Sequence, residues 1–283
     1  MTQKNPILAG VVGWPIGHSL SPLIHTIWAA RAGIDGYYVP VAIPPSFDDF
    51  ACAMDSLIKL GFKGVNVTLP HKEHAVRYAA GASDAARKVR AANMLTFGSE
   101  GPFAENSDIE GFSKVLERCF RATSRMETAL ILGAGGAARG VAMAIKEYGF
   151  SNIVIANRTH EKAQAVASEF ELTPVNWEQR NDALPDVDLL VNTTSLGMKG
   201  QAPLDLKTES IKPQTVVADI IYTPLETPLL KAARKHGCET TNGLMMLMFQ
   251  AAPGFRAWFG GAALVDTELR NALARELARR GSE

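Results

Sequence analysis

The stretch TALILGAGGAARG, residues 128–140, joins a short apolar segment to a glycine-rich turn and then to a helix-forming segment. Gly133, Gly135 and Ala138 have the spacing G-x-G-x-x-A, typical of the first strand, turn and helix of a dinucleotide-binding fold. The first glycine permits the tight turn, the second lets backbone approach a pyrophosphate, and the alanine permits close packing of helix on strand. We therefore predict dinucleotide binding at this turn; a purely structural glycine turn is the alternative.

Short runs rich in β-branched residues alternate with helical patterns on both sides of this stretch. They cover residues 7–13, 37–43, 63–69, 92–97, 128–132, 152–156, 188–192 and 215–221. Such alternation is typical of parallel sheets with crossover helices, and a length of 283 residues suits two domains. We predict an α/β fold with two α/β domains around a cleft, the C-terminal one a Rossmann-type, doubly wound parallel sheet.

The domain boundaries are indicated by a polar stretch at 121–128 and by a change to a helical apolar pattern near Asn242. We expect residues 1–121 plus 242–283 to form a substrate-binding and catalytic domain, with the C-terminal segment packed back on the first half. Residues 122–241 are expected to form the dinucleotide-binding domain.

Helix ends are marked by capping residues. Ser21, followed by Pro22, is a candidate N-cap for a helix that Gly33 closes. Ser46, with Asp49 three residues on, is expected to open a second helix that ends near Gly61.

Charge and cysteine content restrict the class of ligand. The chain has 29 Lys+Arg against 29 Asp+Glu, so we expect neither nucleic acid nor a membrane surface as a partner, but a small molecule. Three widely separated cysteines suggest neither a disulfide framework nor a zinc site. No long apolar run or signal peptide is apparent, and we expect a soluble cytoplasmic protein without a metal.

The cofactor preference is indicated by the residues after the strand at 152–156. A carboxylate at this point would hold the ribose 2′-hydroxyl of NAD, but the chain has Asn157, Arg158 and Thr159, with Lys162 one turn later. A guanidinium can bind a 2′-phosphate, so NADP is favoured; a solvated loop arginine is the alternative. The segment NTTSLGM, 192–198, could line the same cofactor site or form an ordinary turn.

Four segments of the N-terminal half carry polar residues at strand-to-helix junctions, namely 18–22, 66–72, 91–95 and 105–112. Each has a structural explanation, since Ser21 and Asp108 could cap helices and Asn93 could satisfy backbone groups. Together they supply the hydroxyls, amides, ammonium and carboxylate needed to orient a polyhydroxylated acid. Lys72 and Asp108 are the best pair for proton transfer. His71 and His74 are expected to be solvated.

The order and spacing of these segments resemble the shikimate dehydrogenase family over nearly the whole chain. The matching motifs are GWPIGHSLSPLIH from residue 13, NVTLPHK from 66, NSD from 106, GAGGAAR from 133, NRT from 157, NTTSLGM from 192, DIIYTPLETPLL from 219 and NGLMMLMFQAA from 242. The resemblance implies a bilobed enzyme that reduces 3-dehydroshikimate to shikimate with NADPH, reversibly.

The resemblance also implies roles by motif position. Lys72 is the implied acid/base, paired with Asp108. The implied substrate-binding residues are Ser19, Ser21 and Tyr222 for the carboxylate, and Thr68, Asn93, Asp108 and Gln250 for the ring hydroxyls. The implied NADP contacts are Gly133, Gly135, Gly136, Ala137, Asn157, Arg158, Lys162, Ile220 and Gly243.

Several residues depart from the family pattern. Ser107 replaces the usual Thr, Met94 the usual Thr, Asn242 the usual Asp, and Met245 a usual Gly. Met245 adds bulk beside the expected nicotinamide region. Two other functions stay open: a quinate/shikimate dehydrogenase of broader substrate or cofactor range, and a non-catalytic NADP-binding sensor. The sequence is compatible with a monomer or a homodimer.

Overall fold

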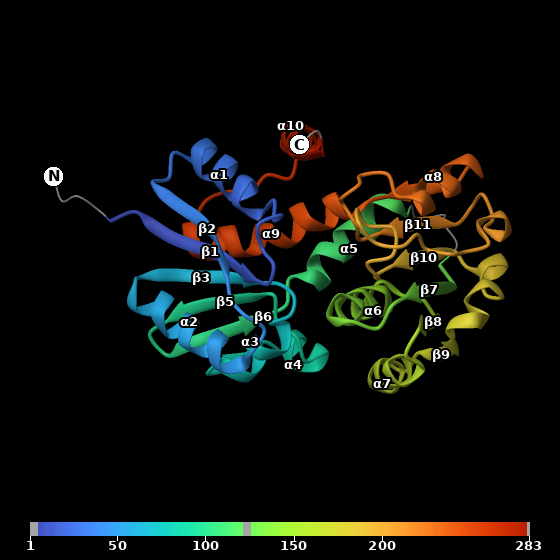
Figure 1. Cartoon of the computed structure of the whole chain (residues 1–283), viewed down its shortest axis with the longest axis horizontal. Coiled ribbons are helices and arrows are strands. Elements are labelled where there is room, and N and C mark those ends of the chain that lie inside the picture. The colour runs from blue at the N-terminus through green and yellow to red at the C-terminus, as the bar shows by residue number, and fades with distance from the viewer. Residues whose placement is uncertain (1–4, 121–125, 282–283) are drawn as a thin grey trace. The chain divides into compact units, whose positions relative to one another are not determined.

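The computed structural model describes residues 5–120 and 126–281 (Figure 1). By contacts, the chain divides into two compact units, Met1–Ser107 with Met248–Glu283, and Asp108–Leu247. The sequence placed these divisions after residues 121 and 241, and part of the polar stretch 121–128 lies outside the described residues. The helix after Ser107 belongs to the second unit because it packs on the helix of the glycine-rich turn.

The first unit is built on a six-stranded sheet in the order β2-β1-β3-β5-β6-β4. Its strands are β1 (Ile7–Gly13), β2 (Gly36–Ala42), β3 (Phe62–Val67), β4 (Gly81–Ala82), β5 (Met94–Gly98) and β6 (Gly101–Glu105). This sheet is mixed rather than wholly parallel, because β5 runs antiparallel to both β3 and β6. A two-residue connection between Gly98 and Gly101 makes β5 and β6 a hairpin, and a hairpin is necessarily antiparallel.

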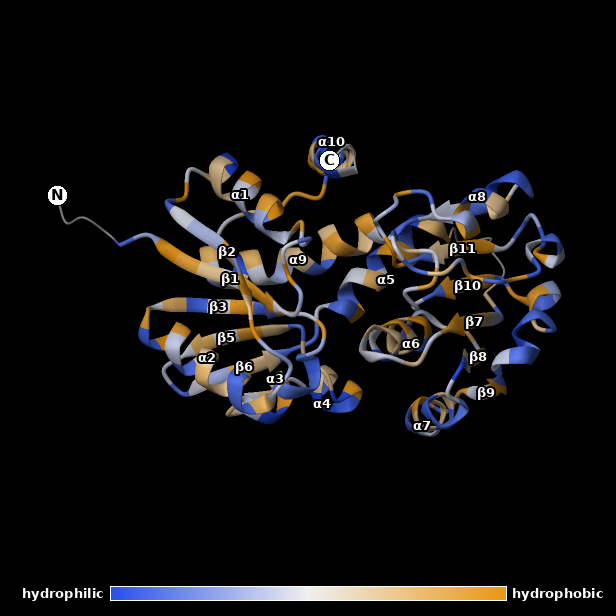
Figure 2. Ribbon diagram, in the orientation of Figure 1, coloured by the Kyte–Doolittle hydropathy of each residue, from blue (hydrophilic) through white to orange (hydrophobic). Residues whose placement is uncertain are grey.

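Helices α1 (Ser21–Ala32), α2 (Phe47–Lys59), α3 (Lys72–Tyr78) and α4 (Asp84–Val89) follow the strands of this sheet. Phe50, Met54 and Leu57 of α2 are buried in one cluster with Val12 and Val65 of the sheet. Hydrophobic colours mark β1 and, in the second unit, β7, β10 and β11 (Figure 2). This burial of apolar surface fixes the strand ends that carry the polar residues.

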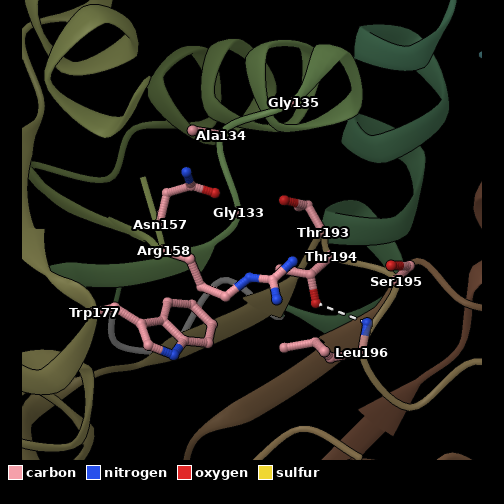
Figure 3. Close-up of a pocket in the computed structure, with 10 residues that line it drawn as sticks. All are labelled: Gly133, Ala134, Gly135, Asn157, Arg158, Trp177, Thr193, Thr194, Ser195 and Leu196. Carbon is pink, nitrogen blue, oxygen red and sulfur yellow. Dashed lines mark hydrogen bonds between the residues drawn. The ribbon is translucent and has the colours of Figure 1, made fainter. Parts of the chain in front are cut away.

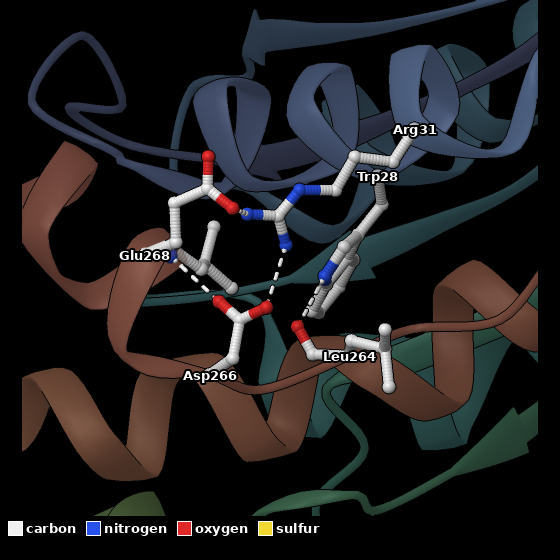
Figure 4. Close-up of polar contacts among 6 residues, drawn as sticks. Trp28, Arg31, Leu264, Asp266 and Glu268 are labelled. Atoms are coloured by element: carbon white, nitrogen blue, oxygen red, sulfur yellow. Dashed lines mark hydrogen bonds and ion pairs between the residues drawn. The ribbon is translucent and has the colours of Figure 1, made fainter.

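The C-terminal segment packs on the first helix, as expected. It comprises α9 (Gly243–Phe259), of which the residues from Met248 belong to this unit, and α10 (Thr267–Gly281). The indole N–H of Trp28 donates to the carbonyl of Leu264 at 2.8 Å, and Arg31 pairs with Asp266 at 3.1 Å and with Glu268 at 2.8 Å (Figure 4). These contacts hold the last helix beside α1.

The ends of α1 and α2 differ in how well they were predicted. Ser46 caps α2 by accepting a hydrogen bond from the backbone N–H of Asp49 at 3.0 Å, and Gly33 closes α1 in the left-handed region at φ 63°. Ser21 is not the N-cap of α1, however. The helix begins at Ser21 itself, and the cap position is Leu20, which has no side-chain cap.

The second unit is built on six strands in the order β12-β11-β10-β7-β8-β9, and every pair is parallel. They are β7 (Thr128–Leu132), β8 (Asn152–Asn157), β9 (Thr173–Asn176), β10 (Leu189–Asn192), β11 (Val216–Asp219) and β12 (Glu239–Thr241). In chain order this is the 3-2-1-4-5-6 arrangement of a doubly wound nucleotide-binding sheet. The predicted Rossmann-type sheet is confirmed.

The strand order reverses between β7 and β10, and this point decides where a ligand binds. Helices α5 (Asp108–Cys119), α6 (Gly136–Tyr148), α7 (His160–Phe170) and α8 (Pro228–Lys235) belong to this unit, with short 3-10 helices η1 (Trp177–Asn181), η2 (Leu184–Asp186) and η3 (Thr208–Ser210). Right-handed crossovers place α6 and α7 on one face and α8 on the other. The turns after β7 and β10 therefore diverge and leave a crevice.

Among the helices of the described residues, none combines the length and the apolar character needed to span a membrane.

Candidate functional site

A pocket of about 220 Å³ lies at the carboxyl ends of β7, β8 and β10 in the second unit (Figure 3). Its lining residues are Gly133, Ala134, Gly135, Asn157, Arg158, Trp177, Thr193, Thr194, Ser195 and Leu196. This is the position that the reversal of strand order defines for a ligand.

The glycine-rich turn forms one wall of this pocket, and its two glycines have different reasons to be there. Gly133 has φ 105°, and a Cβ on it would stand 2.6 Å from Oγ1 of Thr193, so both conformation and space require glycine. A Cβ on Gly135 would meet nothing within 4 Å. Gly135 is thus dispensable for the fold, and its missing side chain leaves the backbone open to a ligand.

Helix α6 begins at Gly136, with Gly135 at the N-cap position and no side-chain cap. The first N–H groups of a helix have no intrahelical partner and attract anions. Ala138 is fully buried, as close packing of helix on strand requires. The turn therefore has the form expected of a pyrophosphate site, although Gly136 and Ala137 do not line the pocket.

A second pocket adjoins the first and is lined by cationic and hydroxyl groups. Arg158, Thr159 and Lys162 line it together with Ala134, Gly135 and Asn157. The Nδ2 of Asn157 donates to the carbonyl of Thr159 at 2.8 Å, which fixes the loop that carries Arg158. The structure thus brings the predicted 2′-phosphate residues together beside the glycine-rich turn.

The segment after β10 forms the opposite wall of the first pocket, through Thr193, Thr194, Ser195 and Leu196. Asn192 holds this loop: its Oδ1 accepts from the N–H of Thr194 at 3.0 Å, and its Nδ2 donates to the carbonyl of Leu196 at 3.2 Å. The N–H of Leu196 in turn donates to Oγ1 of Thr194 at 3.1 Å (Figure 3).

Asn192 also joins this loop to a buried carboxylate. Its Nδ2 donates to Oδ1 of Asp219 at 3.1 Å, the N–H of Ile221 donates to the same oxygen at 3.1 Å, and the hydroxyl of Thr227 donates to Oδ2 at 2.8 Å. Burial raises the pKa of Asp219 to about 6, against the opposing effect of these three donors. One side chain therefore ties the ends of β10 and β11 to the start of α8.

Ile220 and Gly243 lie close together near the ends of β11 and β12. A Cβ on Gly243 would stand 1.9 Å from the carbonyl oxygen of Ile220, so only glycine fits. Asn242 accepts from the N–H of Leu244 at 3.2 Å and donates to the carbonyl of Leu225 at 3.0 Å. The hydrogen bond to the carbonyl of Leu225 needs a donor. The amide of Asn242 supplies one, whereas the carboxylate of the usual Asp could not.

The remaining predicted residues of this unit are Asp108 and Tyr222. Asp108 is buried and is the first residue of α5, and Tyr222 is half-buried in the loop after β11. Ile220, Tyr222 and Gly243 do not line the two pockets described above.

The first unit contains a network of buried amides and hydroxyls. Nδ2 of Asn93 donates to Oε1 of Gln250 at 2.8 Å and to Oγ of Ser107 at 3.0 Å. Oγ of Ser107 donates to the carbonyl of Gln250 at 2.7 Å, so Ser keeps the hydroxyl of the usual Thr. The hydroxyl of Tyr38 donates to Oδ1 of Asn66 at 2.7 Å, and Nδ2 of Asn66 donates to the carbonyl of Asn93 at 3.1 Å.

Two serines and a threonine lie at neighbouring strand ends. Oγ of Ser19 accepts from the N–H of Ser21 at 3.2 Å, which orders the turn before α1. The N–H of Thr68 donates to the carbonyl of Val12 at 2.9 Å, so the turn after β3 is tied to the end of β1.

Lys72 is the first residue of α3, directly after the turn that contains Pro70. The expectation that the neighbouring histidines are solvated is wrong for His71, which is fully buried. Its Nε2 lies 2.9 Å from the carbonyl oxygen of Ile43, and its Nδ1 lies 3.1 Å from Nδ1 of His74. The burial of His71 was not predicted because its partner, the carbonyl of Ile43, is 28 positions away in the sequence.

Sequence reasoning missed Trp177, Tyr38 and Asp219 as parts of these sites. In the sequence pattern Trp177 and Tyr38 look like ordinary hydrophobic core residues. Only the fold places Trp177 at the pocket and Tyr38 in the polar network. Asp219 could have been noticed, because a carboxylate at the end of an apolar strand is an unusual residue to bury.

A doubly wound parallel sheet with an anion-binding turn at its switch point defines the second unit as a Rossmann-type NAD(P)-binding unit. Residues 11–95 of the chain match the shikimate dehydrogenase substrate binding domain, and residues 114–202 match the shikimate/quinate 5-dehydrogenase family. The chain belongs to the shikimate dehydrogenase family.

Individual relatives agree with this assignment. The chain is 48% identical over 270 residues to a shikimate dehydrogenase (NADP(+)) from Acidiphilium cryptum, covering 95% of this chain and 96% of the relative. A shikimate 5-dehydrogenase from Thermus thermophilus, solved with NADP(H) and shikimate, has 32% identity and a TM-score of 0.84 and covers 96% of this chain and 99% of its own. A quinate dehydrogenase from Corynebacterium glutamicum, solved with NAD, has 26% identity and a TM-score of 0.88, with coverage of 96% and 100%.

Proposed function

We propose that the chain is an NADP-dependent shikimate dehydrogenase that interconverts 3-dehydroshikimate and shikimate. The observation that carries this proposal is the pocket lined by Arg158, Thr159 and Lys162 beside the glycine-rich turn. It offers cations and no carboxylate at the place where the adenosine ribose binds in this fold, which suits a 2′-phosphate. The relatives named shikimate dehydrogenase (NADP(+)) support the same cofactor and reaction.

Bound NADPH would supply the hydride for the reduction. We assign its pyrophosphate to the backbone of Gly133, Gly135, Gly136 and Ala137 at the start of α6, and its 2′-phosphate to Asn157, Arg158 and Lys162. Ile220 and Gly243 complete the cofactor site. The close approach of Gly243 to Ile220 supports this assignment, because it keeps side-chain bulk away from the backbone there.

The substrate is a carboxylic acid with a hydroxylated ring. We assign its carboxylate to Ser19, Ser21 and Tyr222, and its ring hydroxyls to Thr68, Asn93, Asp108 and Gln250. The hydrogen bonds that fix Asn93 against Gln250 and Ser107 support this role, because a recognition group must be held in one orientation. For the domains we propose the roles expected from the sequence, with substrate binding in residues 1–121 and 242–283 and NADP binding in 122–241.

Lys72 is the proposed acid/base. In the direction of reduction its ammonium donates a proton to the carbonyl oxygen of 3-dehydroshikimate as the carbon gains a hydride, and in reverse its amine accepts the hydroxyl proton. Asp108 orients the lysine as its carboxylate partner. Both groups are polar residues that begin helices, α3 and α5 respectively.

We also propose that the protein acts in the cytoplasm, as a monomer or a homodimer, with no nucleic-acid or membrane partner. Cys52, Cys119 and Cys238 are all free thiols, which fits a reducing compartment. The balance of 29 basic and 29 acidic residues supports a small-molecule partner.

A steady-state assay with two substrates and two cofactors tests the function. Shikimate with NADP is expected to give the highest kcat/KM of the four combinations. A kcat/KM for quinate with NAD equal to that for shikimate with NADP would instead identify a quinate/shikimate dehydrogenase. The similarity to the NAD-bound quinate dehydrogenase is the reason to test this alternative. Binding of NADP without turnover of either substrate would identify a sensor.

A further inference from the structure

Trp177 is the one aromatic residue among the ten that line the first pocket of the second unit. The other lining residues are glycine, alanine, small polar residues, Arg158 and Leu196. Trp177 is the first residue of η1 and directly follows β9. None of the motifs of the sequence contains it.

The indole of Trp177 is held in place by a buried arginine. The guanidinium carbon of Arg180 lies 4.5 Å from the centroid of the indole ring. Arg180 is itself fixed, because its Nε and one terminal nitrogen donate to the carbonyl of Asp205 at 3.2 and 2.7 Å, and another donates to the carbonyl of Trp177 at 2.5 Å. An aromatic ring fixed in this way loses little freedom when a ligand stacks on it.

The position of Trp177 identifies the part of the ligand that it meets. In a doubly wound sheet the residues at the end of the second strand recognise the adenosine ribose, and here that strand is β8. Strand β9, from which Trp177 follows, is the next strand outward on the same side of the switch point. Figure 3 shows Arg158 and Trp177 entering the pocket from the same side, with the guanidinium of Arg158 extending toward Thr194.

We propose that Trp177 is a binding residue for the adenine of the dinucleotide, with its indole supplying the stacking surface while Arg158 holds the neighbouring 2′-phosphate. The inference rests on the proposed function, since it takes NADP as the ligand. Stacking of a base on an aromatic face needs no hydrogen-bond readout, and the small residues of the pocket leave room for a flat ring.

A purely structural role for Trp177 makes a different prediction. The side chain also packs against the hydrophobic core that contains Leu184 and Leu190. If packing were the only role of Trp177, its replacement would lower the stability of the protein and would weaken the binding of all cofactor fragments by the same factor. Stacking on adenine instead predicts a loss confined to ligands that contain adenine.

The test compares two fragments of NADP. Adenosine 2′,5′-bisphosphate contains adenine and the 2′- and 5′-phosphates of its ribose, and nicotinamide mononucleotide contains neither adenine nor the 2′-phosphate. Binding to the full chain is measured by calorimetry and by quenching of tryptophan fluorescence. The variants are Trp177→Phe, which keeps a ring for the core, and Trp177→Ala; Trp14→Phe, at an exposed tryptophan of the first unit, is the fluorescence control.

The bisphosphate is expected to quench the wild type and Trp14→Phe but to lose most of that quenching in Trp177→Phe. Its affinity is expected to fall about tenfold in Trp177→Ala, with that of nicotinamide mononucleotide unchanged. Full quenching in Trp177→Phe, or equal losses for both ligands, would overturn the role of Trp177 alone. If the wild type bound neither NADP nor the bisphosphate, the proposed function would fail with it.

Discussion

The side chain of Asn93 donates a hydrogen bond to Oε1 of Gln250 at 2.8 Å, although the two residues are 157 positions apart in the sequence. One lies just before β5 and the other lies in α9, so the fold alone brings them together. The bond orients two amides that we assign to the same substrate.

If both amides bind ring hydroxyls, their replacements should act as a unit. Asn93→Ala and Gln250→Ala are each expected to raise KM for shikimate about tenfold, because each variant loses one or two buried hydrogen bonds. The Kd of NADP is expected to change little. The double variant should lose less than the sum of the single losses. Asn271→Ala, at an exposed position of α10, is the control. Strictly additive effects on KM would contradict a shared role.

The two glycines of the dinucleotide turn should separate stability from binding. Gly133→Ala is expected to lower Tm, because it forces a Cβ to 2.6 Å from Thr193 Oγ1 at φ 105°. Gly135→Ala has open space around its Cβ and should keep Tm within a few degrees while it weakens NADP, because the methyl group occupies ligand space. Thermal melts and NADP titrations of both variants measure this. Retained NADP affinity in a folded Gly135→Ala protein would show that the pyrophosphate lies elsewhere.

Arg158 should distinguish the two cofactors. Arg158→Ala removes a charge-assisted contact to the 2′-phosphate and is expected to reduce kcat/KM for NADP by about 10- to 100-fold, with NAD nearly unaffected. The measurement is kcat/KM for each cofactor with shikimate, and Arg275→Ala, at an exposed arginine of α10, is the control. Equal losses with NADP and NAD would mean that Arg158 does not read the phosphate.

Asp219 should make stability depend on pH. Its pKa is raised by burial from 3.8 to about 6, so between these values the folded state holds a proton that the unfolded state has lost. Its contribution to stability is therefore full below pH 3.8 and falls as the pH rises through 6, by about 2 to 3 kcal/mol in all.

The variant Asp219→Asn has no charge to bury and tests this directly. Its free energy of unfolding, relative to the wild type, is expected to rise between pH 4 and 7 by about 2 kcal/mol. Urea unfolding of both proteins across this range gives the difference at each pH. A constant difference would show that the wild-type carboxylate is ionised without penalty in the folded protein.

The sequence predicts the second unit better than the first for a physical reason. The glycine-rich turn, the apolar strands and Arg158 are local signals, and each acts through its own backbone or its immediate neighbours. The antiparallel β5, the burial of His71 against the Ile43 carbonyl and the bond between Asn93 and Gln250 depend on partners distant in the chain. Trp177 lines a pocket only because β9 lies beside β8.

The helix starts show the same distinction on a smaller scale. Ser46 was predicted correctly as a cap because its acceptor contact is to a residue three positions on. Ser21 was not, because Ser19 accepts the N–H of Ser21 and the helix begins there. A capping motif alone does not distinguish these two geometries.

The role of Lys72 in proton transfer is the central claim, and replacing this one side chain tests it most directly. Turnover of shikimate and the Kd of NADPH are measured for Lys72→Ala beside Lys59→Ala, an exposed lysine at the end of α2. We predict that kcat falls by about 10²- to 10⁴-fold in Lys72→Ala only, with the Kd of NADPH unchanged in both variants. A Lys72→Ala enzyme with near wild-type kcat would contradict the account.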